Sequence, residues 1–513
     1  MNLAYGDLRA RADRGIFNFF WRRMRNKWPF IISIIVPILA FVFIIFLPTQ
    51  PNILTILPLY IIMIALILSR PLIALVLLIV STSTVFSLDT FPQVIATGDV
   101  GLYLPEALCI FLTVRMLFIG AIRKDLHKEA SPITLPMIAL FLWLAFSVLN
   151  ALLLQRATLI NAVLTGRSYI YYLNFFLALY YIDSDEKMRF VMKSLTVIAF
   201  ICALLSFIQY IAGPENRILP WAAWTISRVV PEGEDLTLAR VMPASISLIY
   251  MFFFPVLAGV TNGGLKNNWG YRLFIILAII SMFVSFTRNV YYSVILGLFL
   301  IWMTFRGKIR RAITRNVITV AFFVLLVTYL PVYFGVIKVP NWWEQVVSRQ
   351  SETVRSPNDI ETMVWRTVET KTIMGAITKS PILGNGIGAT YYHPMYQANV
   401  SIAHNGYMAI VFQLGLIGLA IFAMIFICYV VQSIKVYQAI EDKYYRSIIL
   451  GFLVVFVALL PAVWVKPVLV LEHHWISLIA FIWAFPAIIS RINTQQRNGT
   501  EGVDDFEKAE KGG

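Results

Sequence analysis

A histidine and an amide stand directly before a long apolar stretch in the last quarter of the chain. They are His404 and Asn405, and Gly406-Tyr407 opens the stretch that follows. An unperturbed histidine titrates at a pH of about 6.5, so a neutral imidazole can accept a proton at physiological pH. His404 is therefore the candidate general base, or a group that orients an acceptor. The alternative is a helix cap, and Asn405 is equally an N-cap or a group that orients the imidazole or a sugar.

Arginines at the ends of other apolar stretches supply fixed positive charge. Arg288 lies between two stretches, Arg167 begins another, and Arg240 precedes a third. Guanidinium groups bind phosphate oxygens through paired hydrogen bonds and keep their charge. The three are candidate ligands of an anionic phosphate. Arg288 could instead be an interfacial residue that reaches toward water. Arg167 and Arg240 could instead pair with the acids Glu232, Glu234 and Asp235.

The segment before His404 holds further candidates for binding a glycan. Tyr392 and His393 lie between a run of glycines and His404. Tyrosine rings stack on sugar rings, so this loop could hold the glycan, and a solvated loop is the alternative. Arg366, earlier in the same segment, is a weaker candidate.

No metal site and no cofactor are predicted. Glu472-His473-His474 are adjacent, and neighbouring residues cannot by themselves supply three converging ligands. An interfacial cap is the preferred interpretation of this triplet. The acids expected on the outer side do not include a close pair of aspartates. These acids are Asp89, Asp99, Glu106, Glu232, Glu234 and Asp235.

Composition identifies the elements that must position these residues. Of 513 residues, 59% are hydrophobic and 13% are charged, and the mean hydropathy is +0.76. The apolar runs are long enough to cross about 30 Å of hydrocarbon. The predicted fold class is therefore all-α, a polytopic helical membrane protein in a lipid bilayer. The net charge of +15 does not indicate a nucleic acid partner, because the basic residues lie in short loops that set topology.

About 14 candidate spans can be delimited, so about 12 to 14 transmembrane helices are expected. They cover 29–47, 52–68, 71–87, 102–119, 133–154, 163–182, 190–212, 244–260, 271–287, 289–305, 316–337, 406–431, 447–465 and 475–490. Basic residues after the fourth, tenth and twelfth spans fall on one side if both termini are cytoplasmic, as the positive-inside rule requires.

The chain divides into five predicted segments. They are a basic amphipathic helix on the cytoplasmic leaflet (1–28), spans with outer loops (29–337), a large extracytoplasmic helical loop (338–405), C-terminal spans (406–490) and a disordered cytoplasmic tail (491–513). Within the large loop a helix is expected at 359–379. Pro381 ends that helix, and a flexible turn is expected at Gly384–Gly388.

Three short motifs follow one another within about residues 280–430. They are Ser285-Phe286-Thr287-Arg288, Trp365-Arg366 leading to Ser380-Pro381-Ile382-Leu383-Gly384-Asn385-Gly386-Ile387-Gly388, and His404-Asn405-Gly406-Tyr407 with Gly415-Leu416-Ile417-Gly418-Leu419. The ordered set resembles the O-antigen ligase/polymerase superfamily of bacterial envelope glycosyltransferases. The resemblance implies a fold of the GT-C-like kind.

The resemblance also implies a reaction. Members of this family transfer a glycan from a polyprenyl pyrophosphate to an acceptor hydroxyl at the outer face of the bacterial cytoplasmic (inner) membrane. The acceptor is lipid A–core in a ligase and another lipid-linked repeat in a polymerase, and both remain open. His404 then takes the catalytic role. Substrate binding falls to Arg288, Arg240, Arg167, Asn405, Arg366, Tyr392 and His393. A single displacement implies inversion, and partners in envelope polysaccharide export are expected.

Two other classes of function compete with this interpretation. A transporter or flippase of lipid-linked oligosaccharides usually places acids or broken helices near the bilayer midplane. Here Glu106, near the outer end of a span, is the only obvious acid within one, which favours surface chemistry. A noncatalytic scaffold of an envelope assembly predicts that His404→Ala and Arg288→Ala leave glycan products unchanged.

Overall fold

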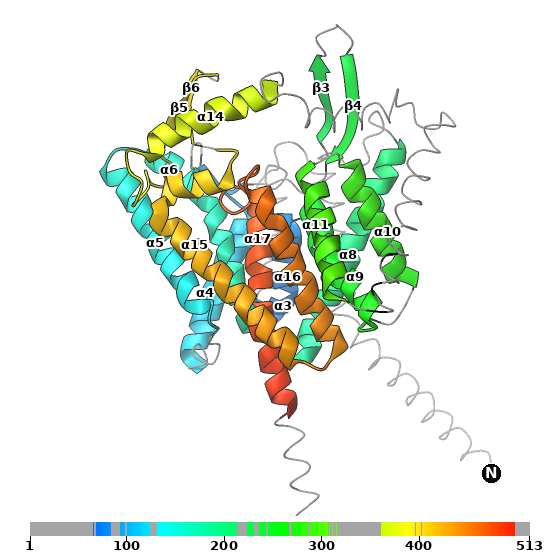
Figure 1. Cartoon of the computed structure of the whole chain (residues 1–513). Helices are drawn as coiled ribbons and strands as arrows, with labels where there is room; N and C mark the ends of the chain where they lie inside the picture. Colours follow the sequence, from blue (N-terminus) through cyan, green and yellow to red (C-terminus); the bar gives the residue numbers. More distant parts are fainter. Residues whose placement is uncertain are drawn as a thin grey trace, which may run out of the picture.

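A bundle of helices with short hairpins at one end makes up the computed structural model of the chain (Figure 1). The structure describes residues 65, 68–83, 93–97, 100–123, 131–212, 223–229, 235–242, 245–265, 269–285, 288–305, 307, 310, 314, 361–395, 397–401 and 403–497. The expected amphipathic helix 1–28 and the spans 29–47 and 316–337 lie outside these residues, as does nearly all of 52–68.

The described elements are mostly helices. They are α3 (Pro71–Ser83), α4 (Leu104–Arg123), α5 (Thr134–Leu153), α6 (Leu159–Gly166), the 3-10 helix η3 (Arg167–Leu173), α7 (Asn174–Tyr181), α8 (Asp185–Ala212), α9 (Ile246–Asn262), α10 (Trp269–Val284), α11 (Arg288–Thr304), α14 (Glu361–Ile377), α15 (Gly406–Ala439), α16 (Lys443–Val463) and α17 (His473–Trp483). The strands form three antiparallel pairs. They are β1 (Gln93–Thr97) with β2 (Val100–Tyr103), β3 (Ala223–Val229) with β4 (Asp235–Met242), and β5 (Tyr391–His393) with β6 (Ala398–Val400).

The prediction of a polytopic all-α membrane protein is confirmed. Within the described residues, six helices are long and apolar enough to cross a membrane, and four shorter apolar helices accompany them. The predicted hairpin of spans 271–287 and 289–305 corresponds to α10 and α11. The predicted span 163–182 is not one continuous α-helix, because η3 separates α6 from α7. The tail predicted to be disordered from residue 491 is helical as far as Arg497.

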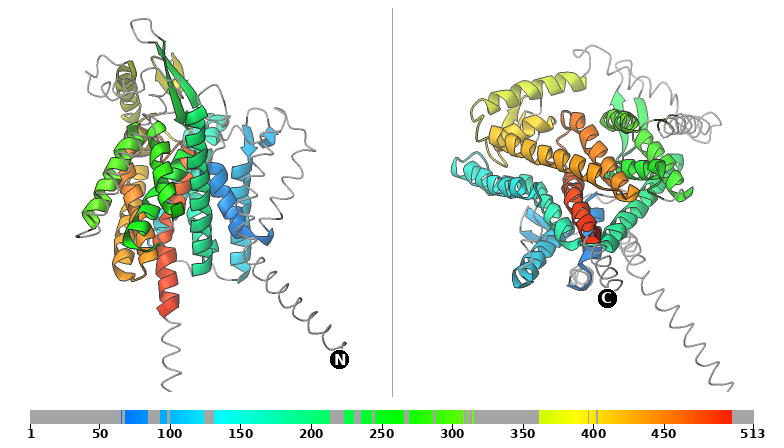
Figure 2. Two further views of the ribbon diagram at one scale, coloured as in Figure 1. Left: turned by 90° about the vertical axis from the view of Figure 1, so that its right-hand side faces the viewer. Right: turned by 60° about the horizontal axis from the view of Figure 1, so that its bottom comes forward.

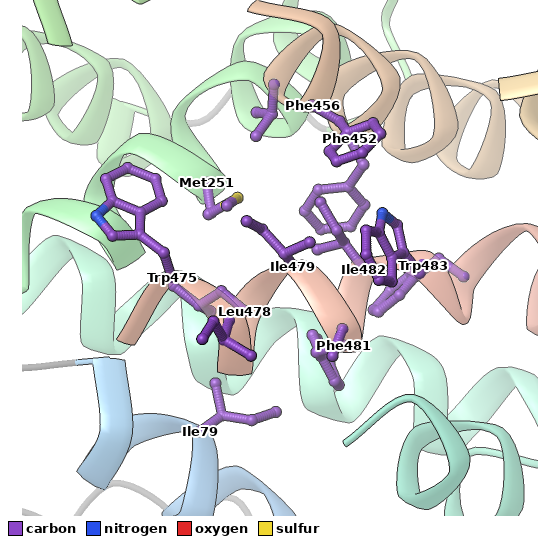
Figure 3. Packing of buried hydrophobic residues seen from close by; sticks show 14 of the residues in the cluster. Ile79, Met251, Phe452, Phe456, Trp475, Leu478, Ile479, Phe481, Ile482 and Trp483 are labelled. Atoms are coloured by element: carbon purple, nitrogen blue, oxygen red, sulfur yellow. The ribbon is translucent and has the colours of Figure 1, made fainter. Parts of the chain in front are cut away.

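The core of the bundle surrounds α17. Figure 2 shows this helix enclosed by the others, and Figure 3 shows its side chains against α3, α9 and α16. Ile479, Phe481 and Trp483 are buried. The helices α9 and α16 approach closely because Gly451 has no side chain: a Cβ there would lie 2.3 Å from Pro255 Cα. Small residues at such crossings allow the close packing that holds membrane helices together.

The long helix α15 is broken at Gly415. This residue has φ 69° and ψ −174°, a conformation that only glycine adopts readily. The break removes intrahelical partners from the carbonyls before it and from the amides after it. In a membrane, such groups must find partners within the protein. Residues of the turn that follows α14 provide most of them.

The turn that follows α14 fits into the break from both sides. The amides of Asn385 and Gly386 donate to the Phe412 and Gln413 carbonyls at 2.7 and 3.0 Å. The Leu416 amide in turn donates to the Pro381 carbonyl at 2.9 Å. We call the turn residues 380–388 the clasp.

The glycines of the clasp adopt positive φ and leave no space for a side chain. A Cβ on Gly384 would lie 2.5 Å from the Gly415 nitrogen, and one on Gly386 would lie 2.4 Å from the Ala151 Cβ. The expected flexible turn at Gly384–Gly388 is therefore wrong: the turn is fixed by hydrogen bonds and close packing. The helix expected at 359–379 is confirmed as α14.

The elements at one end of the bundle carry most of the candidate residues. Helix α14 and the β5–β6 and β3–β4 hairpins lie at the same end, which is the top of Figure 1. We call it the α14 end.

Candidate active site at the α14 end

His404 lies at the start of α15, where the sequence predicts it. The next residue, Asn405, is the N-cap of this helix, and its side-chain oxygen accepts a hydrogen bond from the Met408 amide at 3.1 Å. Gly406 lies against the connection between α16 and α17, since a Cβ there would lie 2.9 Å from the Lys466 carbonyl oxygen. The His404 side chain is 43% exposed. The backbone before α15 is therefore fixed while the imidazole reaches the surface.

A buried carboxylate contacts both the ring and the backbone of His404. Glu369 on α14 is only 3% exposed. One carboxylate oxygen lies 3.1 Å from His404 Nδ1, and the other accepts the His404 backbone N–H at 3.2 Å. The Tyr391 hydroxyl donates to the same carboxylate at 3.3 Å. Sequence reasoning missed Glu369, because it lies 35 positions before its partner in a helix with a weak apolar stripe.

Arg167 is held by a second buried carboxylate. Its Nε lies 2.8 Å from an oxygen of Glu106, which is 2% exposed and lies at the start of α4. The central carbon of the Arg167 guanidinium lies 4.4 Å from the centre of the Tyr103 ring. The Tyr103 amide donates to the other Glu106 oxygen at 2.9 Å. Among the described residues, no hydrogen bond engages the two terminal amino groups of Arg167. The acid that pairs with Arg167 among the described residues is Glu106. Of the acids that the sequence pointed to, Glu232 and Glu234 lie outside the described residues, as does the side chain of Asp235.

Three contacts bring the surroundings of Arg167 to the α14 end. Gly166 lies against Ile387 of the clasp, with a built Cβ 3.5 Å from the isoleucine side chain. The Tyr169 hydroxyl donates to the Gln413 side-chain oxygen at 2.9 Å, directly before the break in α15. The Ser168 hydroxyl donates to the Leu471 carbonyl at 3.2 Å. The last residue of α6 therefore connects Arg167 to the clasp, and helix η3 connects it to α15 and to the α16–α17 connection.

The α16–α17 connection carries the Glu472-His473-His474 triplet. Glu472 precedes α17 but makes no side-chain cap. It pairs with Lys466 at 2.8 Å and lies 3.4 Å from His474 Nε2. Within the described part of the chain, no group of three His, Cys, Asp or Glu side chains is placed to hold a metal ion. Glu472 therefore occupies the N-cap position of α17, and its side chain forms an ion pair with Lys466 instead of capping the helix.

Arg288 and Arg240 are placed by their backbones alone. Arg240 lies in β4, and Arg288 is the first residue of α11; neither side chain is among those described. Helix α9 starts directly after β4 and leads away from the α14 end. Helix α10 leads back to this end, where it contacts β4. The start of α11 therefore lies at the α14 end, like His404.

The remaining candidates lie on α14 and β5. Tyr392 is 55% exposed and is available to a ligand, whereas His393 is fully buried. The His393 ring lies 6.4 Å from that of Tyr391, and its burial leaves it no surface to offer a glycan. Arg366 precedes Glu369 by three residues on α14 and is half-buried. Residues three apart on a helix share a face.

The geometry defines a class of protein. A bundle of membrane-spanning helices presents an imidazole backed by a carboxylate and a guanidinium backed by another carboxylate at one end. Such an end can accept a proton and bind an anion next to a membrane.

Comparison with known families narrows the class. The family model described as O-Antigen ligase matches residues 273–423. The match confirms the resemblance to the O-antigen ligase/polymerase superfamily and supports a membrane enzyme of that general type. It runs from α10 through the break in α15, and so includes Arg288, Glu369, the clasp and His404. No curated protein matches the chain.

Proposed function

We propose that the chain is a glycosyltransferase of the outer face of the bacterial cytoplasmic membrane. It transfers or polymerises a glycan from a polyprenyl-pyrophosphate donor onto an acceptor hydroxyl. The observation that carries the proposal is the placement of the His404 imidazole and the Arg167 guanidinium at one end of the bundle. Contacts of Gly166 with the clasp and of helix η3 with α15 connect the two groups, which supports a common site.

The proposed reaction is a displacement at the anomeric carbon of the donor sugar. The acceptor oxygen forms a bond to this carbon while its proton passes to His404. The bond between the carbon and the pyrophosphate oxygen breaks, and the electron pair leaves with the pyrophosphate. Fixed guanidinium groups stabilise the negative charge that grows on this leaving group. Arg167 is one such group, and Arg288 and Arg240 are proposed as others.

The test uses purified protein in lipid vesicles with a polyprenyl-pyrophosphate-linked repeat as the only glycan. A polymerase is expected to lengthen the glycan and release polyprenyl pyrophosphate. A ligase is expected to do so only when lipid A–core is added. Movement of the lipid-linked glycan across the bilayer without either product would contradict the proposal and identify a carrier.

His404→Ala and Lys371→Ala form a matched pair for the same assay. The histidine is half exposed, so its loss should leave the fold intact, whereas Lys371 is an exposed residue of α14 without a role in the site. Loss of general base catalysis typically costs about 10²- to 10⁴-fold in rate. We expect such a loss for His404→Ala and unchanged transfer for Lys371→Ala. Equal rates in the two variants would support a noncatalytic scaffold.

A further inference from the structure

The hydrogen bonds at Glu369 determine which nitrogen of His404 carries the proton. The His404 backbone N–H donates to Glu369 Oε2, and the Tyr391 hydroxyl donates to Oε1. An ionised carboxylate only accepts hydrogen bonds. Nδ1 of His404, 3.1 Å from Oε1, must then be a donor as well. The lone pair of the neutral ring is consequently on Nε2.

The position of Glu369 relative to His404 is fixed at two points. Ile373 and Ile377 bury the face of α14 one and two turns after Glu369. The clasp follows directly and is hydrogen-bonded to Phe412 and Gln413 of α15. Helix α14, which carries the carboxylate, and the start of α15, which follows the imidazole, are therefore connected twice. One connection is the contact between Glu369 and His404, and the other is the set of hydrogen bonds from the clasp. A side chain whose supports are packed in this way keeps its orientation.

We propose that Glu369 is a positioning residue that selects the Nδ1–H tautomer of His404 and presents Nε2 as the proton acceptor. Its role in turnover rests on the proposed function, but the tautomer does not. When Nε2 takes the proton of the acceptor hydroxyl, the ring becomes a cation that hydrogen-bonds through Nδ1 to a buried anion. A partner of this kind fixes the tautomer and the orientation of a histidine ring.

Glu369→Gln tests the proposal without changing the size of the side chain. The His404 backbone N–H needs an oxygen opposite it, so the amide NH₂ group of the glutamine must occupy the other position, facing Nδ1. There it donates to Nδ1 and forces the proton of the neutral ring onto Nε2. The variant is thus expected to invert the tautomer while it retains the shape of the site. Lys371→Ala on the same helix is the matched control.

The direct readout is the ¹⁵N spectrum of histidine-labelled protein, which holds five histidines. The His404 signals are those missing from His404→Gln. The expected result is an Nδ1–H ring in the wild type and in Lys371→Ala, and an Nε2–H ring in Glu369→Gln. An Nε2–H ring in the wild type, or the same tautomer in the wild type and Glu369→Gln, overturns the proposal.

The kinetic readout separates positioning from substrate binding. Glu369→Gln is expected to lower kcat about 100-fold with little change in the KM of the donor. Glu369→Asp, which keeps the acceptor but shortens it, should restore part of the rate and the Nδ1–H ring. A Glu369→Gln enzyme with wild-type kcat overturns the role in turnover. If the wild type itself transfers no glycan, the proposed function fails, and the spectra still decide the tautomer.

Discussion

The Glu369–His404 and Glu106–Arg167 pairs at the α14 end are built alike and differ in the basic group that they expose. In each, a buried carboxylate contacts a more exposed basic side chain: Glu369 contacts His404, and Glu106 contacts Arg167. An imidazole is a group that can exchange a proton, whereas a guanidinium keeps its charge. The comparison teaches that one pair is suited to proton transfer and the other to holding an anion.

The supports of the two pairs also differ. Glu106 lies at the start of α4, one of the six helices long enough to span a membrane. Glu369 belongs to α14, which lies across the end of the bundle and is held through the clasp (Figure 1). The arginine is therefore fixed to the bundle itself. The histidine depends on a peripheral helix and on the break at Gly415.

Among the variants that compare the two pairs, Arg167→Lys is expected to have the largest effect on glycan transfer. Lysine keeps the charge opposite Glu106 but lacks the two terminal amino groups of the guanidinium fork, which are proposed to bind the anionic donor. Removing one preorganised donor at a developing charge typically costs about 10²- to 10³-fold in rate. We expect transfer to fall by about 100-fold at unchanged thermal stability, measured with the vesicle assay.

Glu106→Gln serves as the companion variant to Arg167→Lys. It leaves the arginine fork in place and removes only the charge that orients it, so a smaller loss of transfer is expected. A larger loss in Glu106→Gln than in Arg167→Lys would contradict the assignment of Arg167 as the anion-binding member.

Gly415→Ala should disrupt the packing of the clasp against α15, which holds Glu369 next to His404. The new Cβ would lie 2.1 Å from the Ile382 carbonyl oxygen, and the φ of 69° disfavours any side chain. We expect a loss of about 3 kcal/mol in the free energy of unfolding. Thermal denaturation in detergent measures it.

Gly375→Ala is the control for the glycine variant. This glycine lies within α14, and no atom lies within 4 Å of a Cβ built on it. Alanine should stabilise the helix by about 0.5 to 1 kcal/mol. Equal stability in the two variants would mean that the clasp does not hold α15 in its broken form.

The smallest effect is expected at Asn405. Asn405→Ala removes the N-cap of α15 and should cost about 1 kcal/mol of stability. Asn405→Ser keeps a capping oxygen and should restore the stability, together with any transfer activity that Asn405→Ala loses. Restored stability with transfer still lost would show instead that the amide contacts the substrate.

Much of the bundle could be predicted from the sequence, because long apolar runs form helices in a membrane. The interruptions of these helices could not be predicted. Tyr169, Ile170 and Tyr172 continue an apolar pattern across η3, so a single span was expected there. Leu414 and Leu416 likewise continue the apolar pattern on both sides of Gly415, so no break was expected there. The break is stabilised by hydrogen bonds from a turn that is distant in the sequence.

The candidate site divides in the same way. His404, Asn405 and Arg167 were predictable because each is a polar residue at the edge of an apolar run. Their carboxylate partners were not, since Glu369 and Glu106 lie 35 and 61 positions away and only the fold brings them close. The burial of His393 also escaped prediction, because a three-residue strand is too short to show which of its residues faces inward.

The division of labour between the two pairs can be tested directly by measuring donor binding and single-turnover transfer in the same samples. His404→Ala should bind the polyprenyl-pyrophosphate donor as the wild type does and fail to transfer its glycan. Arg167→Lys should bind the donor more weakly. Normal single-turnover transfer by His404→Ala would contradict the central claim that this imidazole accepts the proton of the acceptor hydroxyl.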